Sequence, residues 1–238
     1  MRCATGEVHI WRIDLISTAI SLKTLEATLS DEEREKANCF RSTQLRDRWV
    51  AARGALRHIV GSYVRSKPSS LVFQTGPYGK PYLSWPVVNI PFNLSHTASL
   101  ALLAISSEGR VGVDAELIYP IAELEKISRR FFAAPEADEI TALAPKARLA
   151  AFFACWTRKE AFVKALGNGL HIPIDRFRVT VRAEEPPRLV SVDWHEPSRW
   201  SMADVGEPSV AATIAVDGSA AVVRRFEFAS GSVDLDAA

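Results

Sequence analysis

The sequence predicts an α+β fold, on two observations. Helical periodicity dominates residues 44–64 and 148–166, and each of these stretches is followed by several short runs with strand-like alternation. Helices and strands that are segregated in this way favour an α+β arrangement over a parallel βαβ sheet. The chain has 238 residues, of which 47% are hydrophobic and 24% charged. It is therefore in the globular range, with room for one large domain or two small ones.

The first half contains a strand, then helices, then further strands. Residues 8–15 alternate as a strand does, and Ser30 with Glu33 forms the pattern of a capping box that begins a helix. A long helix follows at about 44–64, where apolar residues recur at spacings of three and four. The remaining expectations are a loop at 66–70, a strand at 71–74, a turn at 76–81, and strands at 92–94 and 99–105 on either side of Ser95, His96 and Thr97.

The second half repeats this order after a turn at residues 107–110. We place a boundary at this turn, which divides the chain into residues 1–107 and 108–238. The expected elements are a strand at 111–117, helices near 135–143 and 148–166, strands near 177–181, 188–192, 210–215 and 222–228, and a frayed tail at 230–238.

Charge is clustered although the formal net charge is only +1. Residues 34–67 hold nine basic side chains against two acidic ones, and acidic residues prevail over 114–139. No overall field favours a nucleic acid or a membrane surface, so an anionic ligand has to be met by such a local cluster.

The three cysteines are far apart and lack the C-x-x-C spacing of a zinc or redox site. There is no continuous apolar leader, and the longest apolar stretch is far shorter than the roughly 20 residues that span a bilayer. We therefore expect a reduced, cytoplasmic chain with no membrane anchor.

Two carboxylates stand on one face of the strand expected at 111–117. Because strand side chains alternate, Gly112, Asp114 and Glu116 share a face. Paired carboxylates repel one another unless a cation neutralises them, and Gly112 leaves room for a bulky group to approach. The pattern predicts a hard divalent ion; two solvated acids at a strand end are the alternative.

A third carboxylate lies on the helix expected at 148–166. Trp156, Glu160 and Lys164 follow at intervals of four and share a face. An exposed ion pair would explain Glu160 and Lys164, but the aromatic residues around them indicate a buried helix, on which charges need a partner. Glu160 could complete an oxygen ligand set for magnesium.

Lys80, His96 and Lys164 could together hold a diphosphate. Lys80 lies on a turn rich in glycine and proline, and His96 by itself would more often be structural. The signatures of P-loop, Rossmann and α/β-hydrolase proteins are absent from the sequence.

Four motifs resemble those of the surfactin-type (Sfp-type) 4′-phosphopantetheinyl transferases. They are G-K-P at 79–81, F-N-L-S-H at 92–96, V-G-V-D-A-E at 111–116 and W-T-R-K-E-A-F-V-K at 156–164, in the family's order. The resemblance implies a pseudo-dimer of two similar α+β halves, each with a small, mainly antiparallel sheet packed against a long helix. It also implies coenzyme A between the halves, with Mg²⁺, or Mn²⁺ as a substitute, on the second half.

The resemblance assigns roles residue by residue. Asp114, Glu116 and Glu160 resemble the metal ligands and, with Lys164, the catalytic residues. The residues that resemble coenzyme A contacts are Lys36, Arg48, Lys80, Pro81, Ser95, His96 and Lys164.

The implied reaction transfers 4′-phosphopantetheine from coenzyme A to a serine of an apo acyl- or peptidyl-carrier protein and releases 3′,5′-ADP. Such an enzyme is a holo-[acyl-carrier-protein] synthase, here expected to be monomeric, with Ile118, Tyr119, Phe131 and Phe132 as carrier contacts or core. Two other hypotheses stay open: a nucleic-acid-binding module using the basic cluster, and a magnesium-dependent phosphohydrolase using the carboxylates.

Overall fold

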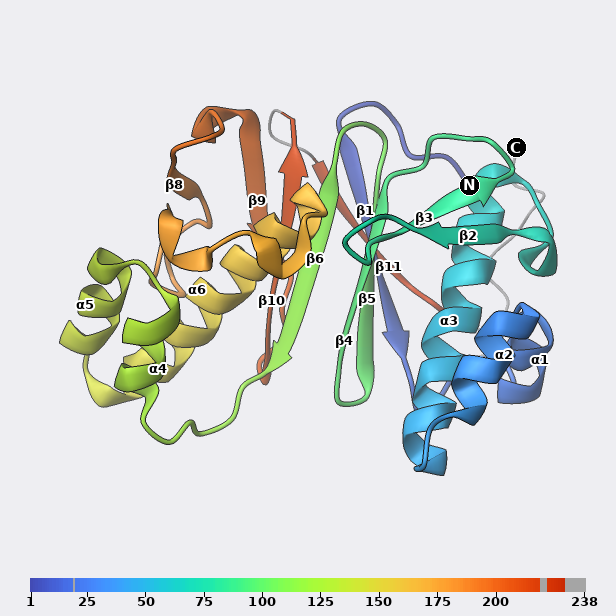
Figure 1. The fold of residues 1–238 in the computed structure, drawn as a ribbon, viewed down its shortest axis with the longest axis horizontal. Coiled ribbons are helices and arrows are strands. Elements are labelled where there is room, and N and C mark those ends of the chain that lie inside the picture. The colour runs from blue at the N-terminus through green and yellow to red at the C-terminus, as the bar shows by residue number, and fades with distance from the viewer. Residues whose placement is uncertain (19, 219–221, 230–238) are drawn as a thin grey trace.

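The computed structural model describes residues 1–18, 20–218 and 222–229 (Figure 1). Its α-helices are α1 (Leu22–Ala27), α2 (Asp31–Asn38), α3 (Thr43–Val64), α4 (Leu124–Phe131), α5 (Ala134–Ala142) and α6 (Pro145–Leu166). Its strands are β1 (Glu7–Asp14), β2 (Val72–Thr75), β3 (Pro81–Trp85), β4 (Phe92–Thr97), β5 (Leu100–Ser106), β6 (Val111–Leu117), β7 (Phe177–Val179), β8 (Leu189–Val192), β9 (Trp200–Asp204), β10 (Val210–Asp217) and β11 (Val222–Glu227). Short 3-10 helices are η1 (Pro68–Ser70), η2 (Gly169–His171), η3 (Ile174–Arg176) and η4 (Pro197–Arg199).

Two sheets lie between the two long helices, which confirms the α+β class (Figure 1). One sheet has the order β11-β1-β5-β4 and packs against α3; the other has the order β6-β10-β9 and packs against α6. β2 pairs with β3, and β7 with β8, in two separate hairpin-like ladders. All pairs are antiparallel except β1 with β11.

The space between the sheets is filled by apolar side chains from both halves. Ile10 of β1 and Leu102 of β5 pack in one cluster with Val113 of β6 and Ile214 of β10. The opposite faces of β1 and β5 point to α3, so every residue of β5 is buried. This common apolar layer fixes the two halves against each other.

The edge strands β4 and β6 are joined by side chains instead of a backbone ladder. Asn93 Oδ1, Ser95 Oγ and Thr97 Oγ1 accept hydrogen bonds from the backbone N–H groups of Val113 (2.9 Å), Ala115 (3.3 Å) and Leu117 (3.1 Å). We call Asn93, Ser95 and Thr97 the side-chain ladder. Because alternate residues of β4 point the same way, three small polar side chains satisfy the edge of the neighbouring sheet.

Most expected elements are confirmed, with shifts of a few residues at their ends. Two expectations about strands need correction. Ser95, His96 and Thr97 lie inside β4 rather than between strands, because β4 and β5 pair as far as Thr97 and Leu100. The strand expected at 222–228 is present as β11, but it pairs with β1 of the first half.

The pattern also missed several elements, namely α1, α4, β3 and β9. The division at residue 107 remains a prediction, and the tail expected at 230–238 lies outside the described residues. Among the described helices, none is long and apolar enough to cross a membrane.

Part of the basic cluster is neutralised inside the first half. The expected capping box is present, with Glu33 Oε2 accepting from the Ser30 N–H at 2.9 Å. The Glu33 carboxylate also binds Arg57 at 2.6 Å and Arg53 at 2.5 Å, and Arg57 is buried. These arginines hold α2 against α3, so they do not offer free charge to a nucleic acid.

We expect Glu33→Gln to destabilise the fold by about 1.5–3 kcal/mol, the range for hydrogen bonds to charged groups. Burial would raise the pKa of Glu33, but the hydrogen bond from Arg57 and the charge of Arg53 hold it below 4.5. The carboxylate therefore stabilises the parent protein above the pKa of the unfolded chain, and this stabilisation is lost as pH falls through the folded pKa.

Urea unfolding at neutral and acid pH measures both effects. The difference between parent and variant should shrink in acid, whereas Glu32→Gln, at an exposed position of α2, should match the parent. A difference that is independent of pH would contradict the ionic role of Glu33.

Candidate functional site

The expected carboxylate pair lies on the face of β6 that is turned toward α6. Val111, Val113 and Ala115 point to the apolar layer between the sheets, so Asp114 and Glu116 point the other way, as the alternation predicts. Asp114 is buried and Glu116 is half-buried. Glu160, also half-buried, reaches the same region from α6, and its charge interacts with both.

Gly112 accommodates α6 rather than a ligand. A Cβ at this position would lie 2.1 Å from the Ala161 carbonyl oxygen and 2.3 Å from the Ala165 nitrogen. The expectation that Gly112 leaves room for a bulky group is correct, but that group is the helix backbone. Since α6 carries Glu160 and Lys164, the contact sets their distance from the β6 carboxylates.

Lys164 pairs with Asp114 rather than with Glu160. Its ammonium lies 2.5 Å from Asp114 Oδ1 and 3.0 Å from Ser95 Oγ. Ser95 donates to Asp114 Oδ1 at 3.2 Å and also belongs to the side-chain ladder. The alternative of a simple Glu160–Lys164 surface pair is therefore wrong: Lys164 connects α6, β4 and β6.

Neighbouring side chains do not fully neutralise the carboxylates of Asp114, Glu116 and Glu160. Asp114 Oδ2 is buried and has no hydrogen-bond partner among the described residues. Burial raises the pKa of Glu116 and that of Glu160, and the negative charge of Asp114 raises both further despite Lys164. A buried, unpartnered carboxylate oxygen with two acidic neighbours fits a hard divalent cation.

The three carboxylates are not gathered as tightly as a closed metal site. Within the described ranges, only Cys3, Glu7 and His9 bring three potential ligand atoms within 4.8 Å of one another. That trio has protein partners: His9 Nε2 lies 3.2 Å from Glu7, the Cys3 thiol donates to the Glu7 carbonyl, and Arg224 binds the other Glu7 oxygen. A shared ion at Asp114, Glu116 and Glu160 therefore requires side-chain rotation.

A cavity of about 290 Å³ lies beside Glu160 and Lys164. From the first half it is lined by Lys80, Pro81, Asn93 and Leu94. The structure thus brings two of the expected coenzyme A contacts, Lys80 and Pro81, next to two of the expected catalytic residues.

The ammonium of Lys80 is bound to backbone carbonyls of the second half. The group donates to the carbonyl oxygens of Val111 (2.8 Å), Lys164 (2.7 Å) and Ala165 (3.1 Å). Because all three of its donors have acceptors, the ammonium does not offer the expected contact to a phosphate in this structure.

The other expected contacts are more dispersed. His96 is exposed at the surface of β4, where partial desolvation and the charge of Lys164 lower its pKa. Lys36, on α2, is exposed and lies over the Trp49 ring at 5.8 Å. Arg48, on α3, has a buried Nε with no hydrogen-bond partner among the described residues.

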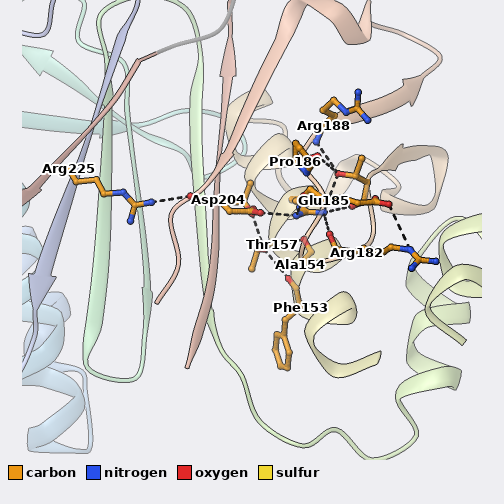
Figure 2. Close-up of polar contacts among 12 residues, drawn as sticks. Phe153, Ala154, Thr157, Arg182, Glu185, Pro186, Arg188, Asp204 and Arg225 are labelled. Atoms are coloured by element: carbon orange, nitrogen blue, oxygen red, sulfur yellow. Dashed lines mark hydrogen bonds and ion pairs between the residues drawn. The ribbon is translucent and has the colours of Figure 1, made fainter. Parts of the chain in front are cut away.

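Two further charges of the 156–164 motif have structural partners that spacing alone did not reveal. Arg158 is fully buried and donates to the carbonyls of Thr180, Arg182 and Glu185 and to Asp204 at 2.8 Å. Figure 2 shows Asp204 between Arg225 and the rest of this network. Its carboxylate also accepts from the Thr213 hydroxyl.

Lys159 pairs with Glu136 at 2.7 Å, and both side chains have no exposed surface. Charged residues on a buried helix need partners. This rule indicates that Arg158 and Lys159 are paired, but it does not identify their partners. Arg158 and Lys159 anchor α6 to the second half, which leaves Glu160 and Lys164 for the site.

A second cavity, of about 200 Å³, has Glu116 in its lining. It is lined by apolar side chains that include Tyr119, Phe131 and Trp156. Of the expected carrier contacts, Tyr119 is exposed and Phe131 lines this cavity, whereas Phe132 is buried in the core. The core interpretation of Phe132 is therefore correct.

Comparison with known proteins gives one consistent result. A profile of the 4′-phosphopantetheinyl transferase superfamily matches residues 110–215. The chain is 34% identical to the 4′-phosphopantetheinyl transferase HetI of Nostoc sp. (strain PCC 7120) over 90% of this chain and 89% of the relative. It is 30% identical to the 4′-phosphopantetheinyl transferase Sfp of Bacillus subtilis (strain 168) over 71% of this chain and 74% of the relative.

We expect Gly112→Ala to destabilise the fold, because the added methyl group meets α6 backbone rather than a flexible side chain. Overpacking of this kind costs about 1–3 kcal/mol. Chemical unfolding measures the loss. Gly76→Ala is the matched control, since a Cβ there would make only ordinary contact, 3.5 Å from the Lys80 carbonyl oxygen. Equal stabilities of the two variants would show that α6 does not rest on β6 at Gly112.

Proposed function

The chain belongs to the 4′-phosphopantetheinyl transferase superfamily, and we propose that it transfers 4′-phosphopantetheine from coenzyme A to a serine of an apo acyl- or peptidyl-carrier protein with magnesium as cofactor. The observation that carries the magnesium assignment is the buried, unpartnered Oδ2 of Asp114 beside Glu116 and Glu160. The cavity next to Glu160 and Lys164 supports coenzyme A binding between the halves.

Asp114, Glu116 and Glu160 would hold the metal. When bound, the ion would neutralise and orient the oxygens of the diphosphate. Lys164 is the only lysine that contacts these carboxylates among the described residues, and its charge suits the same diphosphate. Manganese, which takes similar oxygen ligands, would substitute for magnesium.

The proposed step is attack of the serine hydroxyl oxygen on the β-phosphorus of coenzyme A. A new phosphorus–oxygen bond forms, and the bond between the β-phosphorus and the bridging oxygen breaks, so 3′,5′-ADP leaves with the electron pair. Glu160 accepts the serine proton, since its carboxylate belongs to the lining of the cavity proposed for coenzyme A. Lys164 stabilises the charge that accumulates on the bridging oxygen and the α-phosphate as 3′,5′-ADP leaves.

For the nucleotide we propose contacts from Lys36, Arg48, Pro81, Ser95 and His96, and from the backbone and side-chain stem of Lys80. His96 would face the diphosphate, since it is close enough to Lys164 for the charge of that residue to lower its pKa. The guanidinium of Arg48, whose Nε has no hydrogen-bond partner among the described residues, would bind an anionic group.

For the carrier protein we propose the apolar cavity beside Glu116. Its lining by Tyr119, Phe131 and Trp156 offers a hydrophobic surface next to the carboxylates. A carrier helix that docked there would bring its serine close to the base.

The function is tested by incubating the protein with coenzyme A, magnesium and an apo-carrier protein, followed by intact-mass measurement of the carrier. We expect one phosphopantetheine to be added, and the addition to stop when a chelator removes the metal. Modification that is undiminished by the chelator would remove the metal assignment. Release of 3′,5′-ADP without modification of the carrier would favour a phosphohydrolase.

The two roles of Glu160 can be separated by Glu160→Gln. As a ligand only, the variant should recover its rate at high magnesium, because the amide oxygen still coordinates. As a base as well, it should stay about 10²–10⁴-fold slow at saturating magnesium, since an amide cannot accept the serine proton. We expect the second result from steady-state rates over a magnesium series. Glu184→Gln, at an exposed position, is the control, and recovery to the parental rate would exclude the base.

A further inference from the structure

Lys80 crosses from the first half to the second. It lies in the turn between β2 and β3, yet its ammonium binds one carbonyl of β6 and two at the end of α6, at 2.7–3.1 Å. An ammonium group has three donors and here it has three acceptors. No donor is left for a phosphate in this arrangement, although Lys80 is one of the residues that line the cavity.

The acceptors are groups that need a cation. The carbonyls of Lys164 and Ala165 belong to the last turn of α6, where they have no partner within the helix, and the negative end of the helix dipole lies there. Burial, and then the charge of Arg110, lower the pKa of Lys80 to about 8, so the group remains an ammonium at neutral pH.

The surrounding backbone is shaped around this side chain. Gly167 ends α6 with a φ of 77°, and a Cβ at Gly167 would lie 3.2 Å from Lys80 Cδ. Val111, whose carbonyl is the third acceptor, precedes Gly112, where α6 touches β6. The ammonium therefore binds both elements next to the contact that sets their spacing.

We propose that Lys80 is a positioning residue: it ties the end of α6 to β6 and so holds Glu160 and Lys164 opposite Asp114 and Glu116. Its main effect is on metal binding and rate, and its effect on affinity for the 3′-phosphate nucleotide is minor. The inference rests on the proposed function where turnover rate is measured. Hydrogen exchange of α6 and affinity for 3′,5′-ADP test it independently of that function.

The test compares Lys80→Met, which keeps the length and removes the donors, with the parent. Lys146→Met, at an exposed position of α6, is the matched control. Three quantities are measured: the turnover rate at saturating coenzyme A over a magnesium series, the affinity for 3′,5′-ADP by calorimetry in a chelator, and amide hydrogen exchange of residues 157–169.

We expect Lys80→Met to lower the turnover rate or the apparent magnesium affinity by about 10–100-fold, as loss of a group that orients metal ligands does. Affinity for 3′,5′-ADP should be unchanged, and amides in the last turn of α6 should exchange faster. Lys80→Arg, which retains a cation with several donors, should recover part of the rate. The control variant should match the parent in all three measurements.

Two outcomes would overturn the proposal. One is a loss of 3′,5′-ADP affinity with unchanged turnover and exchange, which would make Lys80 a nucleotide ligand. The other is no change in any quantity. If Lys80→Met does not fold, Lys80→Gln, which keeps two donors but no charge, is measured in the same way. A parent protein that modifies no carrier would refute the proposed function, while hydrogen exchange would still decide whether Lys80 holds α6.

Discussion

The contact between the backbones of α6 and β6 at Gly112 is the constraint on which the site depends. Any side chain at this position would overlap the Ala161 carbonyl, so the helix can lie this close only on glycine. The contact brings a strand that carries two carboxylates next to a helix that carries a third carboxylate and a lysine. Arg158 and Lys159, both fully buried, fix the rotation of the helix, so Glu160 and Lys164 are the charges that remain on the side of the strand.

The second constraint is the way in which the two halves meet. Backbone pairing between β4 and β6 is replaced by the side-chain ladder, in which Ser95 has a double role. Its hydroxyl accepts from the Ala115 N–H and donates to Asp114 Oδ1, so the residue that joins the halves also orients a proposed metal ligand. The geometry of the site is thus coupled to the docking of the halves, and Lys80 adds a second link between them.

The sequence predicted what depends on local periodicity and failed where partners are distant. Alternation placed Asp114 and Glu116 on one face of a strand, and helical spacing placed Glu160 and Lys164 on one face of a helix. Spacing could not show that Lys164 would pair with Asp114, 50 positions away, or that Lys80 would bind carbonyls of the other half. β11 illustrates the same limit: its alternation identified a strand, but its pairing with β1 is set by tertiary packing.

The charges of the site bear on the order of binding under the proposed function. By formal charge, Asp114, Glu116, Glu160 and Lys164 together carry −2. Burial and the negative charges of the neighbouring carboxylates raise the pKa of Glu116 and of Glu160, which shows that these groups repel one another. A diphosphate without a cation would be repelled by this charge. One divalent ion brings the formal charge of these four residues to zero. We therefore infer that the diphosphate of coenzyme A enters together with the divalent ion or after it. The affinity of the protein for the ion and its affinity for coenzyme A then depend on each other.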